Sequence, residues 1–327
     1  MIETHKIKFA VAPEKVKRIG LVGTGTIGSA WAAHFLAQGL DVIATDPNPE
    51  AEKKLRTAID NAWPSLEQLG LVKNASRDRL RFTTSLDEAL KDVDFIQEST
   101  PENNDIKDKV MSAISKAARP DVVIASSTSN IIPTRLQAHC ENPQRMIVGH
   151  PFNPVYLIPL VEVVGGQQTA PETILWAMEF YQHWGKTPLH CRTEIPGHLA
   201  NRLQDALGNE AMRLVAEDIA TTTEVDAALT TGPGLRWALM GTFMTGHLAA
   251  GEGGLRDALT GKFDPDSSVL EATDLEIVER IVAENQSQVS GRSLKEIEQI
   301  RDEFLVGLLK LRADIETKYG FNQGRFL

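Results

Sequence analysis

Two short stretches of this sequence combine residue types that can do chemistry. The first is GTGTIG at residues 23–28, which fits the pattern GxGxxG. The second is GHPFNP at residues 149–154, followed by Glu162 twelve positions after His150. Glycine loops of the first kind can bind nucleotide phosphates, and a histidine with a carboxylate partner can act as a general base. The sequence therefore indicates a redox or transfer reaction that uses a nucleotide cofactor.

The glycine loop lies between an apolar run at residues 17–22, which predicts a buried strand, and a helical pattern at residues 27–38. This strand–loop–helix context is the one that the motif requires. Gly23 permits the tight turn, Gly25 lets the backbone approach a pyrophosphate, and Gly28 lets the helix pack closely on the strand. The helix N-terminus offers N–H groups to the phosphates. The predicted cofactor-binding residues of this loop are Gly23, Gly25, Thr26, Ile27 and Gly28.

Asp46 follows the next predicted strand, residues 41–45, about 20 residues beyond the glycines, where a carboxylate binds the adenosine ribose diol. Its neighbours at residues 47–49 include no arginine to receive a 2′-phosphate, which predicts NAD rather than NADP. The alternative is an ordinary strand–helix turn whose aspartate caps the next helix. Three correctly spaced glycines together with the carboxylate favour the cofactor site.

His150 stands beside proline, so we expect it on a rigid loop rather than in a helix, because proline fixes φ and removes a donor. Glu162 lies within the apolar run LVEVV, which predicts a buried strand, and a buried carboxylate needs a partner. Pairing with His150 would fix the imidazole tautomer and stabilise its protonated form. From spacing alone this pairing and its alternative are about even; in the alternative, His150 is an ordinary loop residue and Glu162 bonds elsewhere.

Strand-like and helix-like segments alternate through the first part of the chain. Further predicted strands are residues 93–97, 122–126, 146–149 and 160–164, and a helix is expected at residues 105–118. This alternation predicts an α/β fold with a doubly wound, Rossmann-type parallel sheet. Residues 49–81 predict a charged helical excursion, and the first 14 residues a short leader with one edge strand.

The pattern becomes helical beyond about Glu194, with glycine-rich breaks at residues 230–234 and 249–254 and a closing amphipathic helix at residues 293–318. We therefore expect an NAD-binding domain of residues 1–194 and an all-helical domain of residues 195–327 for substrate binding and dimerisation. A hinge at residues 195–197 would let the two domains close over the substrate.

Composition narrows the class of protein. The 327 residues carry a formal net charge of −10, which argues against nucleic-acid binding. Cys140 and Cys191 cannot form a disulfide framework, and neither has metal-ligand spacing, so we expect a reducing compartment and no metal. The sequence has no apolar run of about 20 residues and no secretory signal pattern. We expect a cytoplasmic location and no membrane partner.

The motifs together resemble the 3-hydroxyacyl-CoA dehydrogenase family. They are GxGxxG, Ser-Thr-Ser at residues 127–129, the stretch from His150 to Glu162, and PGxxxNR at residues 196–202, in the family's order and over nearly the whole chain. The resemblance implies that His150 is the base and that Glu162 orients it. It also implies that Ser129 and Asn201 hold the substrate oxygen and place the nicotinamide.

The resemblance further implies NAD contacts from Glu102, Lys107, Ser129 and Asn153. Taken singly, these residues have ordinary alternatives as turn residues or as a solvated helix lysine. The implied reaction is oxidation of a secondary alcohol to a ketone, in which His150 takes the hydroxyl proton and hydride passes to the nicotinamide. The family's helical domain also implies a homodimer.

Members of this family act either on acyl-CoA thioesters or on short, free hydroxy acids. Residues 49–81 lack the cluster of Lys and Arg that CoA phosphates would prefer. Residues 230–254 resemble the free-acid branch. L-Carnitine is therefore the first candidate substrate, L-gulonate or another short 3-hydroxy acid the second, and an acyl-CoA thioester the third. The candidate from a different class is a non-catalytic, crystallin-like NAD-binding protein.

A trimethylammonium group such as that of carnitine is best held by aromatic faces. The candidate substrate-binding residues are Phe152, Tyr156, Trp237 and Phe243. Trp237 and Phe243 are six residues apart in a helical pattern, so they could equally be core residues. Arg202 and Arg236 are the candidates for the substrate carboxylate.

Overall fold

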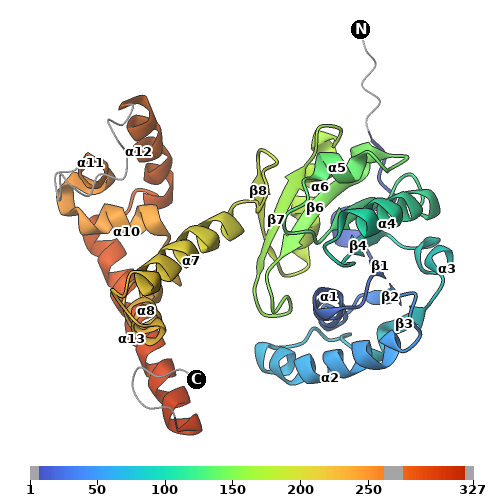
Figure 1. The fold of residues 1–327 in the computed structure, drawn as a ribbon, viewed down its shortest axis with the longest axis horizontal. Coiled ribbons are helices and arrows are strands. Elements are labelled where there is room, and N and C mark those ends of the chain that lie inside the picture. The colour runs from blue at the N-terminus through green and yellow to red at the C-terminus, as the bar shows by residue number, and fades with distance from the viewer. Residues whose placement is uncertain (1–6, 261–274, 321–327) are drawn as a thin grey trace. The chain divides into compact units, whose positions relative to one another are not determined.

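The computed structural model describes residues 7–260 and 275–320 (Figure 1). The chain divides into two compact units, residues 1–206 and 207–327. This division falls within helix α7, Ala200–Ala216. The boundary near Glu194, which the change in sequence pattern suggested, stays a prediction.

The first unit is built on an eight-stranded sheet with the order β3-β2-β1-β4-β5-β6-β7-β8. The strands are β1 Arg18–Val22, β2 Asp41–Thr45, β3 Leu80–Thr83, β4 Phe95–Glu98, β5 Val123–Ser126, β6 Met146–Pro151, β7 Leu160–Gly165 and β8 Thr187–Cys191. Strand order reverses between β1 and β4, and both strands run parallel to each other. A crevice at the carboxyl ends of strands is expected at such a reversal, which is where ligands bind in open α/β sheets.

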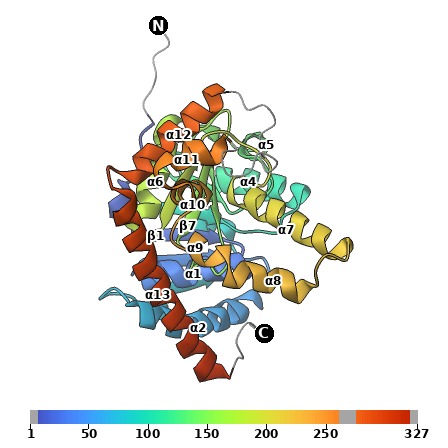
Figure 2. The ribbon, with the colours of Figure 1, turned by 90° about the vertical axis from the view of Figure 1, so that its left-hand side faces the viewer.

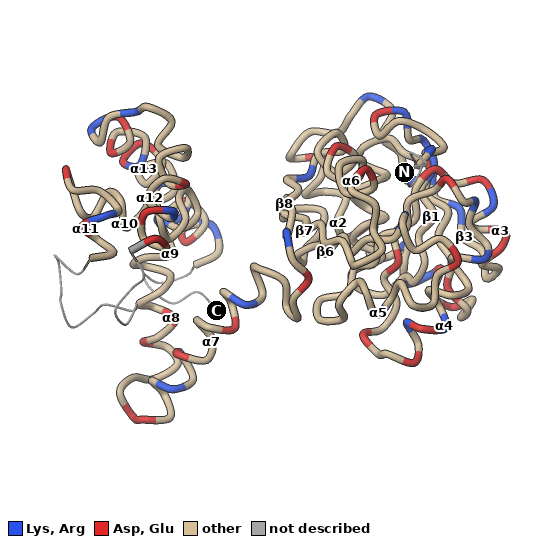
Figure 3. The backbone as a smooth tube through the Cα atoms, turned by 90° about the horizontal axis from the view of Figure 1, so that it is seen from above, with Lys and Arg blue, Asp and Glu red and all other residues tan. Residues whose placement is uncertain are grey.

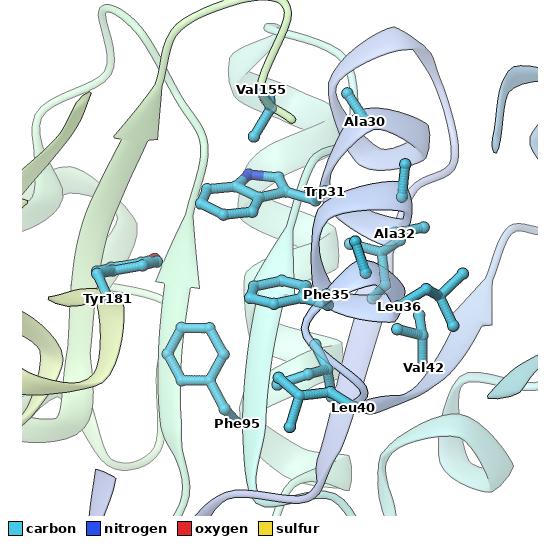
Figure 4. Close-up of a cluster of buried hydrophobic side chains, with 14 of the residues drawn as sticks. Ala30, Trp31, Ala32, Phe35, Leu36, Leu40, Val42, Phe95, Val155 and Tyr181 are labelled. Atoms are coloured by element: carbon cyan, nitrogen blue, oxygen red, sulfur yellow. The ribbon is translucent and has the colours of Figure 1, made fainter. Parts of the chain in front are cut away.

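Helices cover both faces of this sheet (Figure 1). They are α1 Thr26–Ala37, α2 Ala51–Leu69, α3 Leu86–Leu90, α4 Asn104–Ala117, α5 Pro133–Gln137 and α6 Pro171–His183, with short 3₁₀ helices at Pro13–Lys15, Arg77–Arg79 and Pro143–Arg145. Because strand side chains alternate between faces, Phe95 joins the core under α1 and α6 whereas its neighbour Ile96 joins the core under α3 and α4. The first core includes Trp31 stacked on Phe35, with ring centroids 5.0 Å apart (Figure 4).

The second unit is helical in its described residues (Figure 2). After α7 come α8 Thr222–Thr231, α9 Pro233–Trp237, α10 Thr242–Ala249, a 3₁₀ turn at Gly251–Gly253, α11 Gly254–Leu259, α12 Leu275–Val289 and α13 Leu294–Tyr319. Helices α8 and α13 begin with capping boxes, formed by Thr221 with Glu224 and by Ser293 with Glu296. Each box satisfies N–H groups that a helix start leaves unpaired. The expected α/β and helical architecture is confirmed.

Several local expectations were wrong. The sheet is not wholly parallel, because β6 and β7 pair antiparallel. Strands β3 and β8 were not predicted; both are short, and each has a single buried residue, Leu80 in β3 and Cys191 in β8, so their hydrophobic signal is weak. The helical excursion expected at residues 49–81 consists of helix α2, which ends at Leu69, and the 3₁₀ helix Arg77–Arg79; β3 begins within its last two residues, at Leu80. No strand lies in residues 7–14 of the expected leader, and residues 1–6 lie outside the described residues.

His150 lies in strand β6 and not on the loop that its neighbouring prolines suggested. Pro151 ends that strand, so the missing N–H of proline disrupts the ladder only where it stops. In the antiparallel pairing His150 stands directly opposite Glu162 of β7. Strand register, rather than a rigid loop, therefore brings the two side chains together.

Surface charges are mixed: Figure 3 shows Lys and Arg interspersed with Asp and Glu along both units. Within residues 7–260 and 275–320, no helix combines the length and the apolar character needed to cross a lipid bilayer. The same residues contain no cluster of three or more side chains suited to hold a metal ion.

Candidate active site

A cavity of about 900 Å³ opens where the carboxyl ends of β1, β2, β4 and β5 meet, within the first unit. Its volume lies within the range of small-molecule and cofactor sites. Seven of the predicted site residues line it: Gly23, Gly25, Thr26, Ile27, Asp46, Glu102 and Ser129. Gly28, Lys107 and Asn153 are not among the lining residues. The predicted cofactor set thus converges on one crevice at the reversal of strand order.

The structure gives a different reason for the presence of glycine at each of the three positions of the loop. Gly23 has a φ of +88°, and an added Cβ would lie 2.7 Å from the carbonyl oxygen of Ser99. At Gly28 an added Cβ would lie 2.0 Å from the carbonyl oxygen of Gly23, so close packing of α1 on the loop requires glycine. A Cβ at Gly25 would meet nothing within 4 Å. Gly25 therefore faces open space in the cavity wall, where a pyrophosphate could approach the backbone.

Helix α1 begins behind this loop without a side-chain cap, since Gly25 is its N-cap residue. Its first N–H groups and the positive end of its dipole are therefore available to an anion. Asp46, directly after β2, is held by the same loop: its Oδ2 accepts hydrogen bonds from the amide and the hydroxyl of Thr24, at 3.3 and 3.2 Å. No arginine is among the residues described as lining the cavity. This arrangement suits a ribose diol and leaves a 2′-phosphate without a cation of the kind it prefers.

His150 and Glu162 form a buried hydrogen-bonded pair. His150 Nδ1 lies 2.8 Å from Glu162 Oε2, and the residues are 4% and 0% exposed. The other carboxylate oxygen, Oε1, accepts the backbone N–H groups of Leu199 and Ala200, each at 2.9 Å. Burial by itself raises the pKa of Glu162, but the bonds from His150, Ala200 and Leu199 outweigh it and hold the pKa below its usual value.

This bonding pattern sets the chemistry of the imidazole. A carboxylate only accepts hydrogen bonds, so His150 Nδ1 carries the proton of the neutral ring and Nε2 keeps a lone pair. Cys191, whose Sγ lies 3.8 Å from Glu162 Oε1, completes the surroundings of the carboxylate. Burial and the neighbouring carboxylate raise the pKa of the Cys191 thiol to about 12, so it stays a neutral donor. The arrangement provides an oriented general base with a supported imidazolium form.

Glu102 and Lys107 lie beside each other, with Lys107 Nζ 3.8 Å from Glu102 Oε2, and each has closer partners of its own. Glu102 Oε1 accepts hydrogen bonds from the Thr128 hydroxyl and from the amides of Ser129 and Asn130, and so fixes the loop after β5. Lys107 is 1% exposed, and its Nζ lies 2.9 and 3.0 Å from the two carboxylate oxygens of Glu98. The ammonium of Lys107 therefore lies beneath the cavity wall, where it neutralises a buried carboxylate.

The remaining predicted residues fall into two groups. The Phe152 ring lies 4.8 Å from the His150 ring, and Asn153 and Tyr156 follow on the same segment. Asn201 lies in the first turn of α7, next to the amides that bond Glu162. The other group lies in the helical unit or at its approach: Arg202, Arg236, Trp237 and Phe243.

Within the helical unit, Trp237 and Arg312 line an apolar cavity of about 610 Å³. Phe243 is 46% exposed on α10, so it is not a fully buried core residue of its unit. The positions of these residues relative to His150 stay predictions.

Sequence reasoning missed His198 and a buried polar network behind strand β6. The His198 ring lies 5.2 Å from the His150 ring and is 0% exposed. In the network, the Tyr181 hydroxyl donates to Gln97 Oε1 at 2.7 Å, and Gln97 Nε2 donates to Ser127 Oγ at 2.8 Å. Two sequence signals were available: a histidine inside PGxxxN, and a glutamine inside the apolar run of β4.

Comparisons with known proteins agree with this geometry. The profile described as 3-hydroxyacyl-CoA dehydrogenase, NAD binding domain, matches residues 18–195. The profile for the 3-hydroxyacyl-CoA dehydrogenase C-terminal domain matches residues 197–292. The chain is 49% identical to L-carnitine dehydrogenase of Bacillus cereus, over 90% of this chain and 92% of that protein. It is 46% identical to L-carnitine dehydrogenase of Pseudomonas aeruginosa, over 94% and 97% of the two chains.

Two solved structures of dehydrogenases are also similar to this chain. The chain is similar to 5-formyl-3-hydroxy-2-methylpyridine 4-carboxylic acid 5-dehydrogenase, an NAD⁺-dependent dismutase, with a TM-score of 0.71 and 29% identity over 92% of this chain and 99% of that one. It is also similar to 3-hydroxybutyryl-CoA dehydrogenase of Escherichia coli, with a TM-score of 0.62 and 29% identity over 72% of this chain and 49% of that one.

Proposed function

Because this chain belongs to the 3-hydroxyacyl-CoA dehydrogenase family, we propose that it is an NAD-dependent dehydrogenase that oxidises the 3-hydroxyl group of L-carnitine to 3-dehydrocarnitine. The observation that carries the chemistry is the buried pair of His150 and Glu162 at the end of β6, in the same unit as the dinucleotide crevice. The substrate rests on the relatives named L-carnitine dehydrogenase, whose similarity spans nearly the whole chain.

His150 acts as the general base in this proposal. Its Nε2 takes the proton of the substrate hydroxyl, and Glu162 stabilises the imidazolium through Nδ1. The amides of Leu199 and Ala200 keep the Glu162 carboxylate ionised and prevent it from turning away. NAD, bound on the glycine loop, supplies the hydride acceptor. When the ketone is reduced, the same imidazolium returns the proton.

The residues around this pair have proposed roles of their own. Ser129 lines the cavity, and Glu102 bonds its backbone amide, which fixes the position from which its hydroxyl would reach the substrate oxygen or the nicotinamide. Asn201 follows the amides that bond Glu162, which supports a role near the reacting atoms. Phe152 and Tyr156 offer aromatic faces for the trimethylammonium group, and Trp237 and Phe243 are proposed to do so from the helical unit.

We also propose that the protein is a cytoplasmic homodimer. Both cysteines of the chain are free thiols, as expected in a reducing compartment. Large apolar side chains are exposed on the helical unit, including Met212 and Ile219 at 64% and 61% and Leu311 at 58%. Such exposure within one chain supports burial against a second copy. Light scattering coupled to gel filtration should give twice the chain mass of 35.9 kDa, and a value of one chain would reject the dimer.

The substrate is tested by following NADH formation with L-carnitine, L-gulonate, 3-hydroxybutyrate and 3-hydroxybutyryl-CoA. We expect the highest kcat/KM with L-carnitine and NAD. A preference for gulonate or hydroxybutyrate would keep the dehydrogenase and change the substrate, and a preference for the thioester would reverse the order proposed here. NADH binding without turnover of any of the four would favour a non-catalytic protein.

A further inference from the structure

His198 is a second buried histidine beside the proposed base, and the mechanism above gives it no role. Its side chain is 0% exposed, and its ring centroid lies 5.2 Å from that of His150. Its backbone has a φ of +50°, in the left-handed region that glycine adopts far more readily than a residue with a Cβ. Where a residue with a side chain occupies such a position, the surrounding structure holds it there, often at a functional site.

His198 is connected to two parts of the site, the loop after β5 and the carboxylate of Glu162. Its Nε2 lies 3.2 Å from the carbonyl oxygen of Thr128, the residue before Ser129. The two N–H groups that follow His198 in the chain, those of Leu199 and Ala200, both bond Glu162 Oε1. A single residue thus links the loop after β5 to the carboxylate that orients His150.

The hydrogen bonds also fix the state of the ring. A carbonyl oxygen only accepts, so His198 Nε2 carries the proton and Nδ1 keeps the lone pair of a neutral imidazole. Nδ1 is buried and has no hydrogen-bond partner among the described residues. Burial lowers the pKa of His198, and the nearby His150 lowers it further when charged. A neutral His198 leaves His150 as the imidazole that takes the proton, without a second positive charge beside it.

We infer that His198 is a positioning residue for the reaction. Its ring fixes the Thr128–Ser129 loop against the start of α7, and the left-handed turn at His198 aims the next two amides at Glu162. The residue that contacts the substrate oxygen and the base that takes its proton are thereby held at one spacing. This inference rests on the proposed role of His150.

Three substitutions of His198 distinguish the contributions of its ring, of its N–H donor and of its backbone conformation. His198→Phe keeps a planar ring and removes the donor to Thr128. His198→Gln keeps an N–H donor at similar reach. His198→Gly suits the left-handed backbone and removes the ring, which gives a variant that folds even if the phenylalanine is not accommodated. The matched control is His34→Phe, because His34 is also buried, at 4% exposure, and its Nε2 bonds a backbone carbonyl, that of Trp184, at 2.8 Å.

The measurements are kcat and KM for the preferred hydroxy acid, the primary isotope effect with deuterium on the carbinol carbon, NADH affinity and Tm. A shift of about 1 Å in a catalytic group can cost roughly a hundredfold in rate. We expect His198→Phe and His198→Gly to lower kcat about tenfold to a hundredfold and to enlarge the isotope effect, with NADH affinity within about twofold. His198→Gln should retain most of kcat. His34→Phe should lower Tm and leave kcat and the isotope effect unchanged.

Wild-type kcat and isotope effect in His198→Gly or in a folded His198→Phe variant would overturn the inference, as would a glutamine variant as slow as the glycine one. The assay uses whichever of the four hydroxy acids the wild type oxidises, so a wrong substrate leaves this test intact. If the wild type is active and the His198 variants have unchanged kcat and isotope effect, this inference is rejected and the proposed function stands. A wild type that oxidises none of the four rejects the proposed function and this inference with it.

Discussion

The imidazole of His150 has one hydrogen-bonded nitrogen and one nitrogen with a lone pair, and this asymmetry decides what substitutions there should do. His150→Ala removes the proposed base and should lower kcat by about 10²- to 10⁴-fold. NADH affinity should change little, because the cavity proposed to bind the dinucleotide is lined by other residues. Stopped-flow turnover and NADH fluorescence titration measure the two quantities. Unchanged kcat would show that another group takes the proton.

Glu162 should make stability depend on pH. Its folded-state pKa is held below the usual 4.5, so its contribution is fully present above that value and is lost as the pH falls through the folded pKa. Glu162→Gln should therefore be clearly less stable than wild type at neutral pH, and the difference should shrink in acid. Urea unfolding at a series of pH values measures it. A difference that grew as the pH fell would contradict the sign.

Asp46 should govern the choice of cofactor. Its carboxylate is held by Thr24 at the end of β2, facing the cavity. A hydrogen bond to a charged group contributes about 1.5–3 kcal/mol, so Asp46→Ala should raise KM for NAD by roughly tenfold to a hundredfold. KM for NADP should change less, since the lost carboxylate no longer repels a phosphate. Equal changes for both cofactors would indicate a structural rather than a recognition role.

Helix α6 packs closely against strand β6 at Gly149. Gly149 precedes His150, and an added Cβ there would lie 2.0 Å from the Tyr181 hydroxyl oxygen of α6. Gly149→Ala must therefore displace either the strand or the Tyr181–Gln97 hydrogen bond. Overpacking of this kind costs about 1–3 kcal/mol, and a shifted β6 should also lower kcat.

The matched control for this prediction is the double variant Gly149→Ala with Tyr181→Phe. Removing the hydroxyl removes the nearest clash with the new methyl group and leaves the ring carbon Cζ at 2.9 Å, so a smaller shift is needed and the double variant should recover part of the lost kcat. Tm and kcat are measured for both single variants and for the pair. Strictly additive losses would show that the strand and the helix are not coupled through this contact.

Elements also show where sequence reasoning was sufficient. Strands β1, β2, β4 and β5 were predicted because their residues form nearly continuous apolar runs, as buried parallel strands do. Strand β8 was missed because its sequence, TPLHC, includes a proline and mostly exposed positions. The antiparallel pairing of β6 and β7 could not be predicted, since apolar runs carry no strand direction.

For the whole molecule, we predict that the NAD-binding and helical domains close over the bound ligands by a hinge at residues 195–197, a segment that lies within the first unit, residues 1–206. Gly197 has a φ of +77°, a conformation that glycine accepts without strain. Small-angle scattering should show a smaller radius of gyration with NADH and the ketone product than without ligand. Gly197→Ala is the matched variant, which should weaken this compaction. Identical scattering with and without ligands would exclude closure.

The sequence by itself determined the class of fold and predicted the NAD loop with Asp46, because these depend on residue types at short, fixed spacings. It proposed His150 and Glu162 as a pair only through the family resemblance, since their spacing alone left the pairing open. Only the tertiary structure decided how the pair is held. The antiparallel register places His150 opposite Glu162, and the chain returns 37 residues later to bond that carboxylate through Leu199. His198 likewise lies beside His150 because of this return of the chain. Contacts between distant segments depend on packing of the whole sheet, and no local pattern records them.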